Sequence, residues 1–156
     1  MYYVSDNDWS SSHNYDYWNI NFTSAASVNN TDVIKTIYDP SISSFTIPKT
    51  AAFSNFSAVS GYTSNSSNFN VSGSFNKGWN FYKDGWKSGG TIFIASFGYI
   101  KTQTSNKVFV NVQGDYWNNG ANSTSSAYCM CFDSGYISCQ TTNGRSNGFS
   151  LRLVLE

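Results

Sequence analysis

Residues 128–139 have the sequence YCMCFDSGYISC, in which residue types alternate on both sides of a Ser-Gly dipeptide. Alternation of apolar and other residues is typical of a strand with one buried face, and Ser-Gly favours a tight turn. A two-residue turn at this dipeptide pairs Phe132 with Ile137 and Met130 with Cys139. The stretch therefore predicts an antiparallel β-hairpin.

The alternation gives this hairpin two faces of different character. The first face is apolar and is predicted to join the core; it comprises Tyr128, Met130, Phe132, Ile137 and Cys139. The second face is mixed and polar and is predicted to point outward; it comprises Cys129, Cys131, Asp133, Tyr136 and Ser138. We expect Cys139 to be a buried free thiol. A disulfide between Cys129 and Cys131 is not expected, because neighbours two apart on one strand are poorly placed for it.

The rest of the chain contains few helical signals and several strand signals. A short helix is predicted over residues 49–59, with Thr50 as its cap and Gly61 as its end, because aromatic residues recur there at helical spacing. Strands are predicted over residues 91–95, 108–112 and 149–155, which are continuously apolar or alternate. The expected core comprises Phe53, Phe56, Trp79, Ile92, Ile94, Trp117, Met130, Phe132, Phe149, Leu151 and Leu153.

The composition narrows the possible functions. The 156 residues are 12% charged with a net charge of zero, and 18% are aromatic; this length predicts a single domain over residues 1–156. Without a basic stripe there is no electrostatic footprint for nucleic acid, and no apolar run is long enough to span a membrane. One histidine and three cysteines leave most catalytic and metal sites incomplete, so no enzyme activity, metal or cofactor is predicted. Abundant Tyr, Ser, Asn and Gly are typical of binding surfaces.

Several motifs follow one another in a recognisable order. Gly114-Asp115-Tyr116-Trp117 is followed by Tyr128-x-Met130-x-Phe132 and then by residues 148–154, GFSLRLV. Upstream lie residues 33–40, VIKTIYDP, and Ile47-Pro48. Over residues 31–156 this ordered set resembles the major paralogous domain family (FISUMP) of gut and rumen bacteria.

The resemblance implies an α+β, C-type-lectin-like fold, which formylglycine-generating enzymes share. A short helix would pack on a twisted antiparallel sheet, with long loops pinned by aromatic residues and the last strand near the N-terminal one. The resemblance also implies a binding role at a cell surface or on a phage virion, extracellular, within a longer or exported protein. In relatives the C-terminal part is often the variable region of a diversity-generating retroelement, which rewrites adenines, mostly in Asn codons.

The two lines of argument meet on the second face of the hairpin. Adenine changes in AAC or AAT codons reach Cys, Asp, Tyr and Ser, which are the residue types of that face. We therefore expect a variable surface that binds a protein or carbohydrate ligand on a cell surface, with the candidate residues Asn118, Asn119, Asn122, Cys129, Cys131, Asp133, Tyr136, Ser138, Gln140 and Asn143.

Three alternatives stay open. The polar face can be an ordinary surface of a structural or adhesin-type domain that is not diversified. The domain can be an enzyme of the formylglycine-generating type, in which Cys129 or Cys131 would be needed for activity. Tyr116 and Trp117 can form a platform that stacks on sugar rings, or they can be core anchors.

Overall fold

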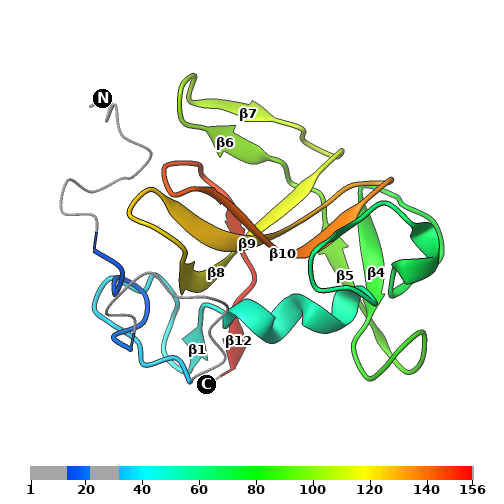
Figure 1. Ribbon diagram of the computed structural model, residues 1–156, viewed down its shortest axis with the longest axis horizontal. Coiled ribbons are helices and arrows are strands. Elements are labelled where there is room, and N and C mark those ends of the chain that lie inside the picture. Colours follow the sequence, from blue (N-terminus) through cyan, green and yellow to red (C-terminus); the bar gives the residue numbers. More distant parts are fainter. Residues whose placement is uncertain (1–13, 22–31, 156) are drawn as a thin grey trace.

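The computed structural model describes residues 14–21 and 32–155, which form a small sheet-rich domain with one seven-residue helix (Figure 1). The α+β class predicted from the sequence is confirmed at this level. Strands β8 (Gly114–Ala121), β9 (Ser126–Phe132) and β10 (Ile137–Gly144) form the centre of a five-stranded sheet. Its edges are β2 (Tyr62–Thr63) and β11 (Ser150–Leu151), in the order β11-β8-β9-β10-β2.

The predicted hairpin is β9–β10. Phe132 pairs with Ile137 and Cys131 pairs with Ser138, as a two-residue turn requires. The register then shifts between Ser138 and Thr141. The predicted pairing of Met130 with Cys139 falls within this irregularity, so only the part of the hairpin next to the turn has the predicted register.

The smaller sheets complete the domain. Strands β3 (Val71–Ser72), β4 (Gly78–Tyr82) and β5 (Thr91–Ala95) form a three-stranded antiparallel sheet, in which β5 matches the strand predicted over 91–95. Strands β6 (Tyr99–Lys101) and β7 (Asn106–Val108) form a hairpin that rises above the main sheet in Figure 1. Strand β12 (Val154–Leu155) pairs with β1 (Phe45–Thr46), so the last strand lies beside the first described one, as predicted.

The helix is shorter than predicted and differs in its ends. Helix η1 (Thr50–Phe56) is a 3-10 helix with Lys49 as its cap residue, and no side chain caps it. It stops at Phe56 rather than at Gly61, because the next residues pair with another segment: the amide of Asn70 donates to Phe56 O at 3.1 Å. The helix packs against β8, β9 and β10 (Figure 1). A second 3-10 turn, η2, covers Ser66–Asn68. No helix among the described residues is long and apolar enough to cross a bilayer.

The strands predicted over residues 108–112 and 149–155 do not have the predicted bounds. Strand β7 ends at Val108, so it contains only the first residue of the alternating run 108–112. The next residues cannot continue it, because Phe109 and Asn111 have φ angles of +57° and +64°, which no strand allows. The amide of Gln113 donates to Phe109 O at 2.9 Å and closes a turn there. The run 149–155 is divided into β11 and β12, because β11 joins β8 in parallel whereas β12 joins β1.

The core occupies both faces of the main sheet. The first cluster contains Phe53, Phe69, Trp79, Phe81, Ile94, Tyr116, Met130, Phe132, Ile137 and Cys139. The second contains Trp117, Ala127, Cys129, Cys131 and Phe149. Most predicted core residues are confirmed as buried, whereas Phe56, Ile92, Leu151 and Leu153 are half-buried. Phe81 and Ile47 are fully buried residues that the sequence analysis did not include.

Candidate functional site

The second face of the β9–β10 hairpin does not point outward. Cys129, Cys131 and Ser138 are no more than 5% exposed, which contradicts the prediction for these three residues. Trp117 and Phe149 stack on this face with ring centroids 4.3 Å apart. The division into two faces was correct, but alternation does not reveal whether a second layer covers the polar face.

The turn residues of the hairpin have structural contacts. Asp133 Oδ1 accepts hydrogen bonds from the amides of Gly135 at 2.6 Å and Tyr136 at 2.9 Å, so this carboxylate closes the turn. The Tyr136 ring is half-buried and stacks on Tyr62 at 5.4 Å. Both side chains are therefore already used in contacts that stabilise the turn, and neither is left available as a dedicated ligand contact.

The polar candidates outside the hairpin turn fall into two groups. Asn118 and Asn119 are 0% and 4% exposed, which contradicts their placement on an open surface. Asn122, Gln140 and Asn143 are half-buried: Asn122 directly follows β8, and the other two belong to β10. The structure therefore does not bring the ten candidates together as one exposed patch.

The three cysteines lie inside the fold. All three are buried and free, which confirms the prediction for Cys139, and the sulfurs of Cys129 and Cys131 lie 3.6 Å apart. The hydrogen bond to Cys129 and burial raise the pKa of the Cys131 thiol well above its ordinary value. Burial raises the pKa of Cys139 to about 12. Because the thiolate is the nucleophile, a raised pKa makes Cys131 and Cys139 weak nucleophiles.

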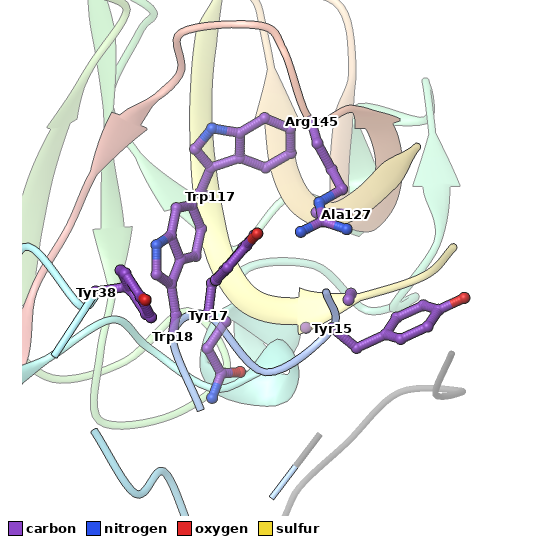
Figure 2. Close-up of a pocket in the computed structure, with 10 residues that line it drawn as sticks. Tyr15, Tyr17, Trp18, Tyr38, Trp117, Ala127 and Arg145 are labelled. Carbon is purple, nitrogen blue, oxygen red and sulfur yellow. The ribbon is translucent and has the colours of Figure 1, made fainter. Parts of the chain in front are cut away.

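A pocket of about 520 Å³ lies on the side of the sheet that carries the second cluster (Figure 2). Its floor comes from β8 and β9, and its outer wall comes from the segment 14–21 together with Tyr38. Segments about a hundred residues apart in the sequence therefore build one site. The lining residues are Tyr15, Tyr17, Trp18, Tyr38, Trp117, Asn119, Gly120, Ala121, Ala127 and Arg145.

Aromatic side chains dominate this pocket. Figure 2 shows the rings of Tyr17, Trp18, Tyr38 and Trp117 gathered around the opening. Tyr17 and Tyr38 meet edge to face at 5.4 Å, and Trp117 is fixed from behind by its stack on Phe149. The floor carries the small residues Gly120, Ala121 and Ala127, whose side chains do not fill the space between these rings. The pocket is thus a largely apolar recess.

Arg145 holds the outer wall to the sheet. Its Nη2 donates to Asn14 O at 2.6 Å, and its Nη1 donates to Thr124 O at 3.4 Å. The guanidinium also lies 5.7 Å from the centroid of the Tyr17 ring, a cation–π distance. Arg145 directly follows β10, so it ties the segment 14–21 to the end of the hairpin and keeps the pocket formed.

Asn119 is the polar group at the floor of the pocket. Its backbone amide donates to Pro48 O at 2.9 Å, within an irregularity of the β8–β9 register between Trp117 and Ala121. Its side-chain Oδ1 and Nδ2 are sealed from the open space of the pocket, and neither has a hydrogen-bond partner among the described residues. Buried polar groups are nearly always paired, so each exception asks for an explanation.

The sequence analysis included Asn119 but for another reason, and it did not find the pocket. Tyr15, Tyr17 and Trp18 lie in a segment without periodicity, so no pattern predicted their position. The density of aromatic residues in this otherwise polar segment was the one available signal. The described residues contain no group of three or more His, Cys, Asp or Glu side chains arranged to hold a metal ion.

Comparisons of the chain with protein-family models, with curated proteins and with solved structures found no match. The pocket and its contacts are therefore the basis for assigning a function.

Proposed function

We propose that this domain is a ligand-binding module and that the aromatic pocket is its binding site. One observation carries the proposal: aromatic side chains from distant segments enclose a recess above small residues of β8 and β9. The volume of about 520 Å³ lies within the roughly 300–1,000 Å³ of small-molecule sites. A few polar groups in an otherwise apolar recess are also typical of such sites.

The pocket is suited to binding rather than to catalysis. The described residues that line it include no carboxylate, imidazole or thiol that could act as a general base or nucleophile. Aromatic side chains instead supply a large contact area with few rotatable bonds. Because Trp117 is already fixed by Phe149 and Tyr17 by Arg145, little ordering would be needed on binding.

The family resemblance supplies a setting for this site. We propose a C-type-lectin-like fold and a role at a cell surface or on a phage virion, with a protein or glycan as the partner. Retroelement-driven variation would then act at half-buried positions such as Asn122, Gln140 and Asn143, not at the buried cysteines. The α+β class and the last strand beside the first described one agree with this proposal.

Two exposed tyrosines provide a test. Tyr38 lines the pocket and is 62% exposed, whereas Tyr62 lies outside it and is 68% exposed. Each ring contacts another tyrosine with centroids 5.4 Å apart, so Tyr38→Ala and Tyr62→Ala are matched in exposure and in lost ring contact. A library of sugars, nucleosides and short peptides would be screened by NMR, with the indole resonances of Trp18 and Trp117 as reporters.

We expect at least one library compound to shift these two indole resonances. Tyr38→Ala should weaken its binding about tenfold, the loss of roughly 1.4 kcal/mol of contact energy, and Tyr62→Ala should leave it unchanged. The proposal is wrong if no compound shifts the pocket resonances, or if the two variants weaken binding equally.

A further inference from the structure

We infer that an exposed apolar turn beside the β6–β7 hairpin inserts into the headgroup region of a bilayer that carries anionic lipids. The domain would then bind that bilayer peripherally. The turn presents Phe109, Val110 and Val112, with Phe97 beside it, and these four side chains form the apolar tip. None of the four lines the aromatic pocket, so the inference goes beyond the proposed function and does not rest on it.

Backbone hydrogen bonds hold the two parts of the apolar tip together. The amide of Asn111 donates to Ser96 O at 2.7 Å, and the amide of Gly98 donates to Gln113 O at 2.8 Å. These two bonds fix the residues on either side of Phe97 against the turn. The turn lies where the chain leaves the β6–β7 hairpin, which rises above the main sheet in Figure 1, and enters β8. The four side chains therefore belong to one surface.

The turn holds its apolar side chains in water with a strained backbone. Phe109 and Asn111 have φ angles of +57° and +64°, a region that bulky residues rarely adopt. The amides of Val112 and Gln113 both donate to Phe109 O at 2.9 Å and close the turn. The side chains of the apolar tip are nonetheless between 47% and 63% exposed. Strain of this kind and exposed apolar patches are both typical of functional contact surfaces.

Cationic side chains flank the apolar tip. Lys101 and Lys107 belong to the β6–β7 hairpin, and Lys77 O accepts from the amide of Ser96 at 2.8 Å. All three lysines are exposed, and none of them forms an ion pair within the part of the chain that the structure describes. Residues 85–114 contain no Asp or Glu. The rim of the apolar tip is therefore positively charged.

The carboxylates next to this region are already enclosed or bound. Asp115 follows the turn by two residues but is 1% exposed. Asp133, which follows β9, is half-buried, and its Oδ1 accepts from the amides of Gly135 and Tyr136. Neither carboxylate is placed to neutralise the exposed lysines around the apolar tip.

This arrangement of charge decides between possible partners. A second copy of the chain would bring the same lysines face to face across a two-fold axis, and like charges repel. An acidic protein would match the charge, but it would also need a recess that fits the turn. A bilayer with anionic lipids offers negative headgroups to lysines and an apolar boundary to Phe and Val side chains, and it requires no matching recess. The observations therefore favour the bilayer.

Sedimentation of the full chain with lipid vesicles tests the inference. One set of vesicles contains phosphatidylcholine alone, and the other contains one quarter phosphatidylglycerol. We expect binding to the anionic vesicles to be at least tenfold tighter than binding to the neutral ones. Raising sodium chloride to about 0.5 M should weaken the binding, because salt screens the lysines.

Two valines with similar exposure provide matched variants. Val110 in the apolar tip is 47% exposed, and Val59 outside it is 40% exposed. Val110→Asp and Val59→Asp change the net charge equally, so only the position differs. We expect Val110→Asp to weaken vesicle binding at least tenfold and Val59→Asp to weaken it less than twofold. Phe97→Ser, at the most exposed position of the apolar tip, is the second variant should Val110→Asp fail to fold, and it should also weaken binding.

A pair of lysines tests the charged rim in the same way. Lys107→Gln should weaken binding to the anionic vesicles about fivefold. Lys83→Gln removes an exposed charge outside the rim and should change binding less than twofold. Equal effects of these two variants would overturn the assignment of the rim.

The other outcomes each overturn the inference. Absence of vesicle binding, or equal binding to neutral and anionic vesicles, would refute it. Equal weakening by Val110→Asp and Val59→Asp would show that the apolar tip is not the contact. A concentration-dependent dimer that Val110→Asp abolishes, without vesicle binding, would assign the surface to a second copy. Binding of polyglutamate without vesicle binding would assign it to an acidic protein.

Discussion

Replacing Gly114 by alanine should damage the core at a defined point. Gly114 begins β8 and pairs with Phe132 of β9. A Cβ at Gly114 would lie 2.5 Å from Cε1 and 2.8 Å from Cε2 of the Phe132 ring, and closer still to Cζ. Carbon atoms in contact prefer separations of about 3.5–4.0 Å. The ring must therefore move by about 1 Å, or the two strands must separate.

The Phe132 ring has little room for that movement. It is fully buried, lies edge to face with Phe81 at 5.4 Å, and is parallel to Tyr116 at 6.3 Å. Overpacking of this kind costs about 1–3 kcal/mol. A gain of about 0.4–1 kcal/mol from the stiffer unfolded chain opposes it. We therefore expect Gly114→Ala to lose about 1–2 kcal/mol net, which corresponds to a fall of roughly 2–8 °C in melting temperature.

Gly61→Ala is the matched control, because a Cβ at Gly61 meets no atom within 4 Å. Both variants would be unfolded in urea and followed by tryptophan fluorescence, and the free energies of unfolding would be compared at equal m-values. Gly61→Ala should be neutral or slightly stabilising. A second change, Phe132→Leu, should recover part of the loss in Gly114→Ala but destabilise the wild type. The packing argument is refuted if Gly114→Ala is as stable as Gly61→Ala.

Three further predictions concern buried groups. Phe132→Ala should lower the free energy of unfolding by about 3–5 kcal/mol in the same assay, and a loss below 1 kcal/mol would contradict its place in the core. Burial raises the pKa of Cys139 from about 9 to about 12, so folding favours the protonated thiol. The contribution of this thiol to the free energy of unfolding is complete below pH 9 and is lost as the pH rises through 12. Urea unfolding at several pH values should show this alkaline loss, and Cys139→Ala should fall less steeply than the wild type; equal slopes would contradict the assignment. Burial also raises the pKa of Asp115 above 3.8, so its stabilising contribution is present in acid and is lost as the pH rises through the raised pKa. Asp115→Asn keeps the acceptor for Gln113, whose Nε2 lies 2.8 Å from Asp115 Oδ1. Melting temperatures measured at pH 4 and pH 7 should show that the variant is more stable than the wild type at pH 7 only. A variant less stable than the wild type at pH 7 would contradict this reasoning.

Local sequence patterns predicted the elements in which short-range signals agree. The β9–β10 turn followed from a Ser-Gly dipeptide between alternating residues, and β5 followed from a short apolar run. The run 108–112 shows the limit of the method. Its valines alternate as in a strand, yet Phe109 and Asn111 adopt positive φ angles and turn the chain. Nothing in the alternation itself distinguishes the two outcomes.

The candidate site was harder to predict because it depends on contacts between distant segments. The polar face of the hairpin was identified correctly, but Trp117 and Phe149 cover it. The pocket joins Tyr17 and Trp18 to Asn119 across about a hundred residues of sequence, and no local pattern reports that contact. Asn119 could be singled out only once its burial and its missing partners were visible.

The most direct test of the pocket as the binding site is the measurement of intermolecular NOEs between a bound library compound and the assigned ring protons of the protein. We predict NOEs from the bound compound to the rings of Trp18, Tyr38 and Trp117. NOEs confined to aromatic residues outside the pocket, such as the exposed Phe97 or Tyr62, would contradict the account.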